Sequence, residues 1–410
     1  MTAIGTLLKK TIPGQLVIQY TDICNARCPQ CGMRVSEKFP RSKLSVDVVK
    51  QIIDSASQKG MQAISFTGGE PLLFFDEIIR MIKYAEDAGI KYIRTGTNGF
   101  LFADHDSPGY RDRIAGIAEK LAETGIYTFW ISIDSSNPEV HESMRGLPGV
   151  IEGIEKALPI FHEHGIYPSA NLGINRNIDG LFPERKMNAV EFYEYFREAF
   201  RNFFDFIIDM GFTISNACYP MSSDSDSVHN DAVYRATSED DVVKFAAHQK
   251  PLLFKALFDT IPDYRSRIRI FSPRSSLFSL IRQYTAGDWN CYPCRGGKEF
   301  FFIDARSGET YPCGYRGEEN LGKFWEMDLS DKNSSPACRK CDWECFRDPS
   351  ELFGPFQDLT SSPLGFFKRM VTDRAYMKLW IQDIQYYRAC DFFNGRTLPD
   401  LKKLSKWASA

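Results

Sequence analysis

Three cysteines lie within eight residues near the start of the chain, in the segment CNARCPQC (residues 24–31). Cys24, Cys28 and Cys31 directly follow an apolar run. A structural zinc site takes four protein ligands, and neither a histidine nor a fourth cysteine lies nearby in the sequence. Three thiolates on a [4Fe–4S] cluster would instead leave one iron open to a substrate or cofactor. The spacing therefore favours a site-differentiated iron–sulfur cluster over a disulfide or a zinc knuckle.

A second set of cysteines lies late in the chain. Its members are Cys291, Cys294, Cys313, Cys338, Cys341 and Cys345. Between the second and third of them, the segment FFFIDARSGETYP (residues 300–312) predicts a β-hairpin that turns at Ser307–Gly308 and holds thiolates near one another. Paired Cys-x2-Cys motifs are also typical of a zinc ribbon, so this reading stays open beside an iron–sulfur cluster. Cys218 and Cys390 stand apart from both sets.

The composition indicates a soluble protein of the cytoplasm. The 410 residues are 43% apolar with a net charge of −3, which does not favour binding to nucleic acid or to an anionic membrane. The first residues lack a secretory signal, and no apolar stretch is long enough to span a bilayer. In a reducing compartment, metal or redox roles are more common for the eleven cysteines than structural disulfides.

Short β-rich runs alternate with helical patterns from residue 15 to about 217, which predicts repeated βα units around a parallel sheet. The expected strands are Leu16–Thr21, Ala63–Thr67, Tyr92–Thr97, Tyr127–Ile133, Pro168–Ile174 and Thr213–Ala217. The expected helices are Val46–Lys59, Phe75–Gly89, Arg111–Thr124, Val150–His164 and Val190–Met210. This order predicts an α/β fold, a partial (β/α)6 TIM-like barrel, with function at the carboxyl ends of the strands.

Polar residues with suitable chemistry follow these strands. Gly68, Gly69 and Glu70 end the second strand, where glycine allows close approach of a ligand and a carboxylate accepts hydrogen bonds from an ammonium group. At the end of the fourth strand, alternation places Ser132 and Asp134 on one face, which suits a ribose diol. Each pattern is also found in ordinary turns and helix caps.

The cysteine spacing, in its place after the first strand, resembles the radical S-adenosylmethionine (radical SAM) superfamily. The resemblance implies that the open iron binds the amino and carboxylate groups of S-adenosylmethionine (AdoMet), with Gly68, Gly69 and Glu70 at the amino group and Ser132 and Asp134 at the ribose. It also implies further cofactor contacts from Asn98, Asn171 and Arg145, whose guanidinium would pair with the methionine carboxylate. Many members have an aromatic residue where this chain has Gln30.

The late cysteines are similar to the SPASM or twitch extension of that superfamily, in which a Cys-x13-Gly-x4-Cys hairpin precedes Cys-x2-Cys. The resemblance implies at least one auxiliary [4Fe–4S] cluster with Cys294, Cys313, Cys338 and Cys341 as preferred ligands. Cys291 and Cys345 would replace one of them or serve a second site. We expect a radical SAM domain over residues 1–285, an auxiliary-cluster domain over 286–350 and a C-terminal helical segment over 351–410 that packs on the barrel.

These resemblances imply an oxidoreductase or transferase-type enzyme. It would cleave AdoMet to a 5′-deoxyadenosyl radical, remove a hydrogen atom from a substrate carbon, and receive electrons from a flavodoxin or ferredoxin. The substrate would be a small metabolite or a peptide. Because the first strand begins by about residue 16 and leaves no room for a leader-binding module ahead of it, a metabolite or a protein modified without such a module is favoured over maturation of a ribosomal peptide by thioether or C–C crosslinking. A non-enzymatic zinc scaffold is the alternative from another class.

Overall fold

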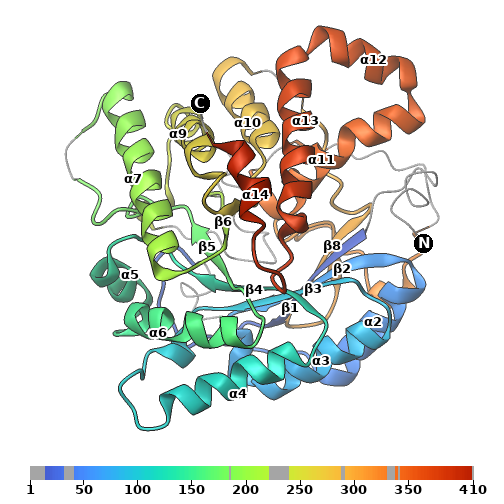
Figure 1. Cartoon of the computed structure of the whole chain (residues 1–410). Coiled ribbons are helices and arrows are strands. Elements are labelled where there is room, and N and C mark those ends of the chain that lie inside the picture. Colours follow the sequence, from blue (N-terminus) through green and yellow to red (C-terminus); the bar gives the residue numbers. More distant parts are fainter. Residues whose placement is uncertain are drawn as a thin grey trace.

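A computed structural model of the chain describes residues 14–31, 41–183, 186–220, 240–287, 291–329, 338–339 and 342–408. One sheet runs through these residues in the order β7-β6-β5-β4-β3-β2-β1-β8-β9 (Figure 1). The strands are β1 (Gly14–Thr21), β2 (Met61–Gly68), β3 (Tyr92–Thr97), β4 (Ile126–Ser132), β5 (Ser169–Gly173), β6 (Ile214–Cys218), β7 (Arg269–Ile270), β8 (Phe300–Ile303) and β9 (Thr310–Tyr311). Because β7 and β9 are separate edges, the sheet is a curved half-barrel rather than a closed one.

The helices follow the strands as the sequence predicts. They are α2 (Val46–Gln58), α3 (Phe75–Asp87), α4 (Tyr110–Ala122), α5 (Pro138–Arg145), α6 (Val150–Glu163), α7 (Ala189–Met210), α9 (Lys250–Tyr264), α10 (Arg274–Ala286), α11 (Glu344–Ser361), α12 (Pro363–Thr372), α13 (Arg374–Ala389) and α14 (Leu401–Leu404). The six predicted strands and five predicted helices are confirmed, each to within two residues at its ends. The sequence reading missed α5, although Asn137 caps it and Pro138 occupies its first turn.

Alternation along the strands separates two packed faces. Leu16, Ile18 and Tyr20 of β1 belong to the main apolar core, which includes buried side chains of α2, α3, α4, α6 and α7. Val17, between them, faces the opposite way and packs with Phe300 and other side chains of the late region. The outer face of the sheet therefore carries the helices of the βα units, and its inner face receives the last third of the chain.

The hairpin β8–β9 joins the barrel sheet directly. Strand β8 pairs in parallel with β1, with Val17 opposite Phe302, and β9 pairs antiparallel with β8. The predicted hairpin is therefore present, with Gly308 at its turn in the left-handed region at φ +67°. Since the sheet is continuous across residue 286, the expected division at that point remains a prediction about folding units.

Helices α11 and α13 lie on the side of the sheet opposite α2, α3 and α4 (Figure 1). Tyr386 of α13 links this layer to β7, because its hydroxyl accepts a hydrogen bond from Ile270 N (2.9 Å) and donates to the carbonyl of Ile268 (3.0 Å). Farther along, the guanidinium of Arg396 donates to the carbonyls of Ala122 and Gly165. The last segment thus crosses back to the amino-terminal ends of β4 and β5.

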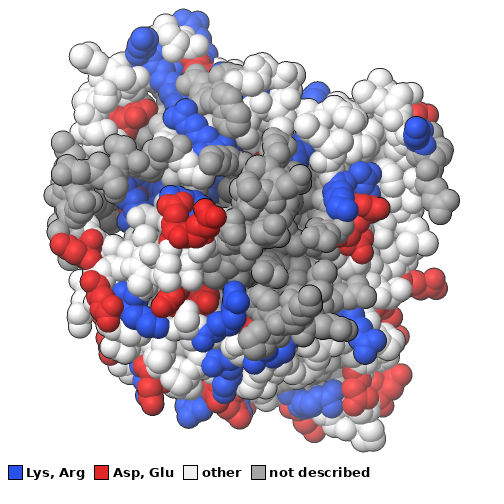
Figure 2. Space-filling view, turned by 180° about the vertical axis from the view of Figure 1, so that it is seen from behind, with Lys and Arg blue, Asp and Glu red and all other residues white. Residues whose placement is uncertain are grey.

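The surface carries both signs of charge. Figure 2 shows, on the face opposite the view of Figure 1, acidic and basic side chains mixed among uncharged ones rather than a broad field of one sign. Within the described ranges, no helix combines the length and the apolar character needed to cross a membrane.

Candidate active site

The three amino-terminal cysteines lie on the loop that leaves the carboxyl end of β1. Cys28 is buried, Cys24 and Cys31 are half-buried, and none of the three forms a disulfide. The loop is held against the end of β2 by backbone hydrogen bonds from Gly69 N to the Thr21 carbonyl (2.7 Å) and from Glu70 N to the Ile23 carbonyl (2.8 Å). The fold therefore positions all three thiols at the predicted end of the barrel.

Gly68 and Gly69 allow this close approach. A Cβ added at Gly68 would lie 2.2 Å from the Thr21 carbonyl oxygen, and one at Gly69 would lie 2.2 Å from the Ile23 carbonyl oxygen. The sequence reading assigned these glycines to the approach of a ligand. In the structure they are required in the first place because the backbone of the cysteine loop itself packs on them.

Glu70 ties together three strand ends. Its buried carboxylate accepts hydrogen bonds from the backbone N–H groups of Asn98 (2.6 Å) and Leu72 (3.0 Å). Burial raises the pKa of this carboxyl to about 7, although these bonds act in the opposite direction. The Asn98 amide donates to Asn25 Oδ1 (2.9 Å) and to Cys24 Sγ (3.8 Å), so Glu70 and Asn98 together support the cysteine loop.

Asp134 and Arg145 form a buried ion pair beside the same loop, with 2.7 Å between Asp134 Oδ2 and Arg145 Nη2. Gln30, in the loop, also donates its amide to Asp134. Burial raises the pKa of the Cys28 thiol to about 12, and the Arg145 guanidinium opposes that rise. Arg145 Nε and Gln30 Oε1 are buried without hydrogen-bond partners, so both retain capacity for a ligand.

Ser132, Asn171 and Asn216 form a row across the inner face of β4, β5 and β6. Ser132 is paired with Asn171 in the strand register, and Asn171 is paired with Asn216. Asn216 Nδ2 donates to Asn171 Oδ1 (2.9 Å), and the Cys218 thiol donates to the same oxygen (3.4 Å). The predicted contacts at the fourth and fifth strands therefore lie side by side at the mouth of the half-barrel.

Glu344, at the start of α11, closes this row from the inner side. Its carboxylate accepts a hydrogen bond from Tyr219 N (3.2 Å) and one from the Cys345 thiol (3.5 Å). Cys218 also contacts this carboxylate, and burial raises the pKa of both thiols well above their usual value. The sequence reading missed Glu344 because nothing in the order of residues indicates that α11 returns to the end of β6.

The late cysteines divide in the structure. Cys294 and Cys338 are joined by a backbone hydrogen bond (2.8 Å), and both lie close enough to the buried Cys313 to affect its pKa, which burial raises to about 12. Cys345 is instead next to Glu344 and Cys218, whereas Cys291 lies near Arg347 and Glu351 of α11. Cys341 is outside the described residues.

One group of possible metal ligands lies close together in the described structure, away from both cysteine sets. Among the described side chains, the one triad of possible ligands within 4.8 Å of one another is His105, Asp106 and Glu152. Lys156 already donates to all three, at 2.8, 3.3 and 2.9 Å. An ammonium group therefore already occupies this triad.

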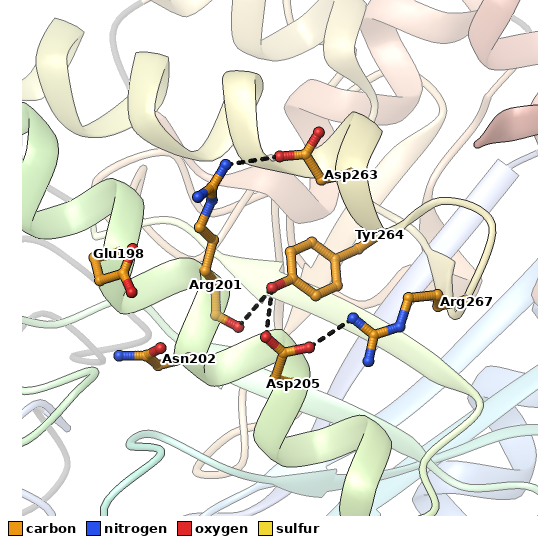
Figure 3. Close-up of a pocket in the computed structure, with 7 residues that line it drawn as sticks. All are labelled: Glu198, Arg201, Asn202, Asp205, Asp263, Tyr264 and Arg267. Carbon is orange, nitrogen blue, oxygen red and sulfur yellow. Dashed lines mark hydrogen bonds and ion pairs between the residues drawn. The ribbon is translucent and has the colours of Figure 1, made fainter. Parts of the chain in front are cut away.

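A separate surface hollow of about 360 Å³ lies between α7 and α9 and is lined by charged and polar side chains (Figure 3). Arg201 pairs with Asp263 (3.0 Å), and Arg267 pairs with Asp205 (2.6 Å). The Tyr264 hydroxyl donates to Asp205 at 2.7 Å. Both arginines of this hollow are therefore neutralised by acidic side chains of the same hollow.

Comparison with known proteins agrees with the position of the cysteine loop. The model of the radical SAM superfamily matches residues 18–208. An AdoMet-dependent heme synthase of Methanosarcina barkeri is 23% identical over 83% of this chain and 87% of its own length. A GTP 3',8-cyclase of Alkaliphilus metalliredigens is 30% identical over 41% of this chain and 54% of its own length.

Solved structures share the fold. Streptococcus suis SuiB bound to S-adenosylmethionine aligns over 87% of this chain and 71% of its own, with a TM-score of 0.50 and 17% identity. The protein anSMEcpe with bound AdoMet aligns over 78% and 81%, with a TM-score of 0.50 and 18% identity. Because the match includes the three-cysteine loop and the ends of β1 to β5, residues 18–208 of this chain form a domain of the radical SAM superfamily.

Proposed function

We propose that this enzyme cleaves AdoMet reductively at a [4Fe–4S] cluster held by Cys24, Cys28 and Cys31, and that it removes a hydrogen atom from a substrate carbon inside the half-barrel. The superfamily implies the cluster and AdoMet. The observation that carries the proposal is the set of three thiols on one loop at the carboxyl end of β1, none of them in a disulfide. When bound, the cluster supplies the one-electron cleavage of AdoMet to the 5′-deoxyadenosyl radical.

The side chains around the loop would bind and orient AdoMet. Arg145 keeps an unpartnered buried Nε for the methionine carboxylate, and Asp134 next to it has a second oxygen for a ribose hydroxyl. Ser132 and Asn171 lie along the same inner row. Glu70 would be a positioning residue, because its carboxylate holds the backbone of Asn98 and thereby the cysteine loop.

An auxiliary [4Fe–4S] cluster held by Cys294, Cys313, Cys338 and Cys341 forms the second part of the proposal. Three of these lie together in the described structure, beside an aromatic cluster that includes Phe300, Trp343 and Phe346. Such a cluster supplies a one-electron acceptor for a substrate radical, which leads to oxidation or to a new bond. Cys291 and Cys345 have other neighbours and are therefore the weaker choices as ligands.

For the substrate we favour a small metabolite. Two relatives that align over most of both chains are named AdoMet-dependent heme synthase. A peptide is the second candidate, because anSMEcpe, which shares the fold, has been solved with a bound peptide. The finer reaction type, oxidoreductase or transferase, depends on which of the two is correct, as does the natural electron donor, for which a flavodoxin or ferredoxin is our candidate.

Anaerobic reconstitution followed by metal analysis tests the proposal. We expect about eight irons per chain, absorbance at about 400 nm, and release of 5′-deoxyadenosine when the protein is reduced in the presence of AdoMet. A content of about four irons per chain would contradict the auxiliary cluster. A colourless protein that retains zinc would support a non-enzymatic zinc scaffold instead. Incubation with cell extracts, separated into small-molecule and peptide fractions, would then identify by mass spectrometry which class of substrate changes.

A further inference from the structure

Arg94 lies on the inner face of the half-barrel. It is the third residue of β3, and its neighbour Ile93 belongs to the core beneath the outer helices. Alternation therefore turns the half-buried Arg94 inward. Gly96 follows on the same face, where a Cβ would lie 2.1 Å from the side chain of Trp130. Arg94 and the Trp130 ring thus line the same part of the interior.

The guanidinium of Arg94 has no counter-charge among the described residues. Its Nε is buried without a hydrogen-bond partner, and no ion pair reaches its other nitrogens. Other buried arginines have a counter-charge or several acceptors: Arg145 pairs with Asp134, and Arg269 donates to Thr213 and to the Asn394 carbonyl. The arginines in Figure 3 are also paired.

The titratable groups closest to Arg94 do not neutralise it. They are Cys345 and Tyr127, and neither is a carboxylate. Arginine itself remains protonated. A partly buried positive charge without a partner is costly, so this guanidinium on the inner face of the sheet indicates a missing anion.

Asn216 supplies a second unmet group on the same face. Its Oδ1 is buried without a partner, whereas its Nδ2 is occupied by Asn171 Oδ1 at 2.9 Å. Asn216 is next to Cys218, which in turn contacts the Glu344 carboxylate. The interior therefore offers one site for an anion and one for a hydrogen-bond donor.

We propose that Arg94 binds a carboxylate of the substrate, and that Asn216 Oδ1 accepts a hydrogen bond from a donor on the same molecule. This specifies the substrate class within the proposed function and rests on it. A carboxylate fits better than a phosphate because a single guanidinium balances one negative charge and its fork matches two oxygens. The Trp130 ring beside it suits an apolar part of the substrate next to that carboxylate.

Thermal unfolding of the reconstituted full-length protein tests this inference without any turnover. The probes are propionate and inorganic phosphate, each compared with chloride at the same ionic strength. We expect propionate at saturation to raise the unfolding midpoint of the wild type by about 2 °C, and phosphate to raise it less. Arg94→Met should abolish the response to propionate, and in chloride it should unfold at or above the wild-type midpoint, because an unpaired charge is removed.

Arg267→Met is the matched control, since it removes a guanidinium that is already paired with Asp205 on the surface and should keep the propionate response. If Arg94→Met folds poorly, Arg94→Lys should fold and show a reduced response, because an ammonium lacks the fork. An unchanged response in either Arg94 variant, or a larger effect of phosphate than of propionate in the wild type, would overturn the assignment. Failure of AdoMet cleavage would sink the proposed function and leave this anion response unaffected.

Discussion

The two cysteine regions of this enzyme are built in different ways. Cys24, Cys28 and Cys31 come from one loop of eight residues, and the end of β2 holds that loop through backbone hydrogen bonds. Cys294, Cys313 and Cys338 come from three segments, joined by the β8–β9 hairpin and by a backbone hydrogen bond between Cys294 and Cys338. The first site is therefore local in sequence, and the second exists only when the late chain folds against the barrel.

Their surroundings differ as well. The first loop lies beside the Arg145–Asp134 pair and the Asn98 amide, which are polar groups suited to a charged cofactor. The late thiols lie among Phe300, Trp343 and other aromatic side chains. This difference in surroundings is what we expect if the first site binds AdoMet and the second accepts an electron, as proposed.

The largest expected effect comes from the first region. Cys28→Ala removes one of three proposed ligands and should lower AdoMet cleavage to the level of iron-free protein, with iron falling from about eight to about four per chain. Cys390→Ala, which changes a buried thiol in the C-terminal aromatic cluster, should keep both iron and cleavage. Substantial cleavage by the Cys28 variant would show that these thiols do not hold the AdoMet-binding cluster.

The second region should respond differently. Cys313→Ala should also lower the iron content from about eight to about four, yet release of 5′-deoxyadenosine should persist because the first loop is intact. Product formation, assayed by mass spectrometry once the substrate is known, should be lost. Cys291→Ala is the control, since its thiol lies near Arg347 and Glu351 and not with the other three, so we expect it to retain about eight irons. An equal loss of iron in the Cys313 and Cys291 variants would indicate that Cys291 is also a ligand.

The same contrast explains what the sequence could predict. The strands and helices of the βα units follow from local periodicity, and several helices end at glycines with positive φ, such as Gly89 and Gly211. The three-cysteine loop and Glu70 follow strands that can be recognised in the sequence. Local patterns were therefore enough for the half-barrel and for the first part of the site.

Features that depend on distant segments could not be predicted. The pairing of β1 with β8 joins residues near opposite ends of the chain, and no local pattern specifies it. Arg94, in the run YIRTGT, has the sequence pattern of an ordinary strand with one exposed face. Its inward position as an unpaired charge depends on the curvature of the sheet and on α11 covering it.

The close packing of the first loop provides a third prediction. At Gly69→Ala, the new Cβ would lie 2.2 Å from the Ile23 carbonyl, so the cysteine loop must move, at a cost of about 2 to 4 kcal/mol in unfolding free energy. Iron at the first site should fall while the late site remains filled. Gly89→Ala is the control: it also replaces a glycine, at φ +86° with no atom within 4 Å of the new Cβ, and should cost about 1 kcal/mol with no loss of iron. Similar iron loss in both would mean that close packing on the loop is not the cause.

The smallest expected effect is electrostatic and concerns Glu70. Burial raises the pKa of this carboxyl from 4.5 to about 7 in the folded protein, so between these values the folded state binds a proton that the unfolded chain does not. The unfolding free energy must then fall as pH rises through this window. Glu70→Gln should abolish this part of the pH dependence. Measured by urea unfolding, the free energy of unfolding of the wild type should fall by about 1 to 3 kcal/mol relative to the variant between about pH 5 and about pH 8. Glu119→Gln, on the exposed face of α4, gives the reference for removing a carboxyl. A constant difference between wild type and Glu70→Gln across this range would show that the Glu70 carboxylate is already ionised at low pH and that its bonds to Asn98 and Leu72 outweigh burial.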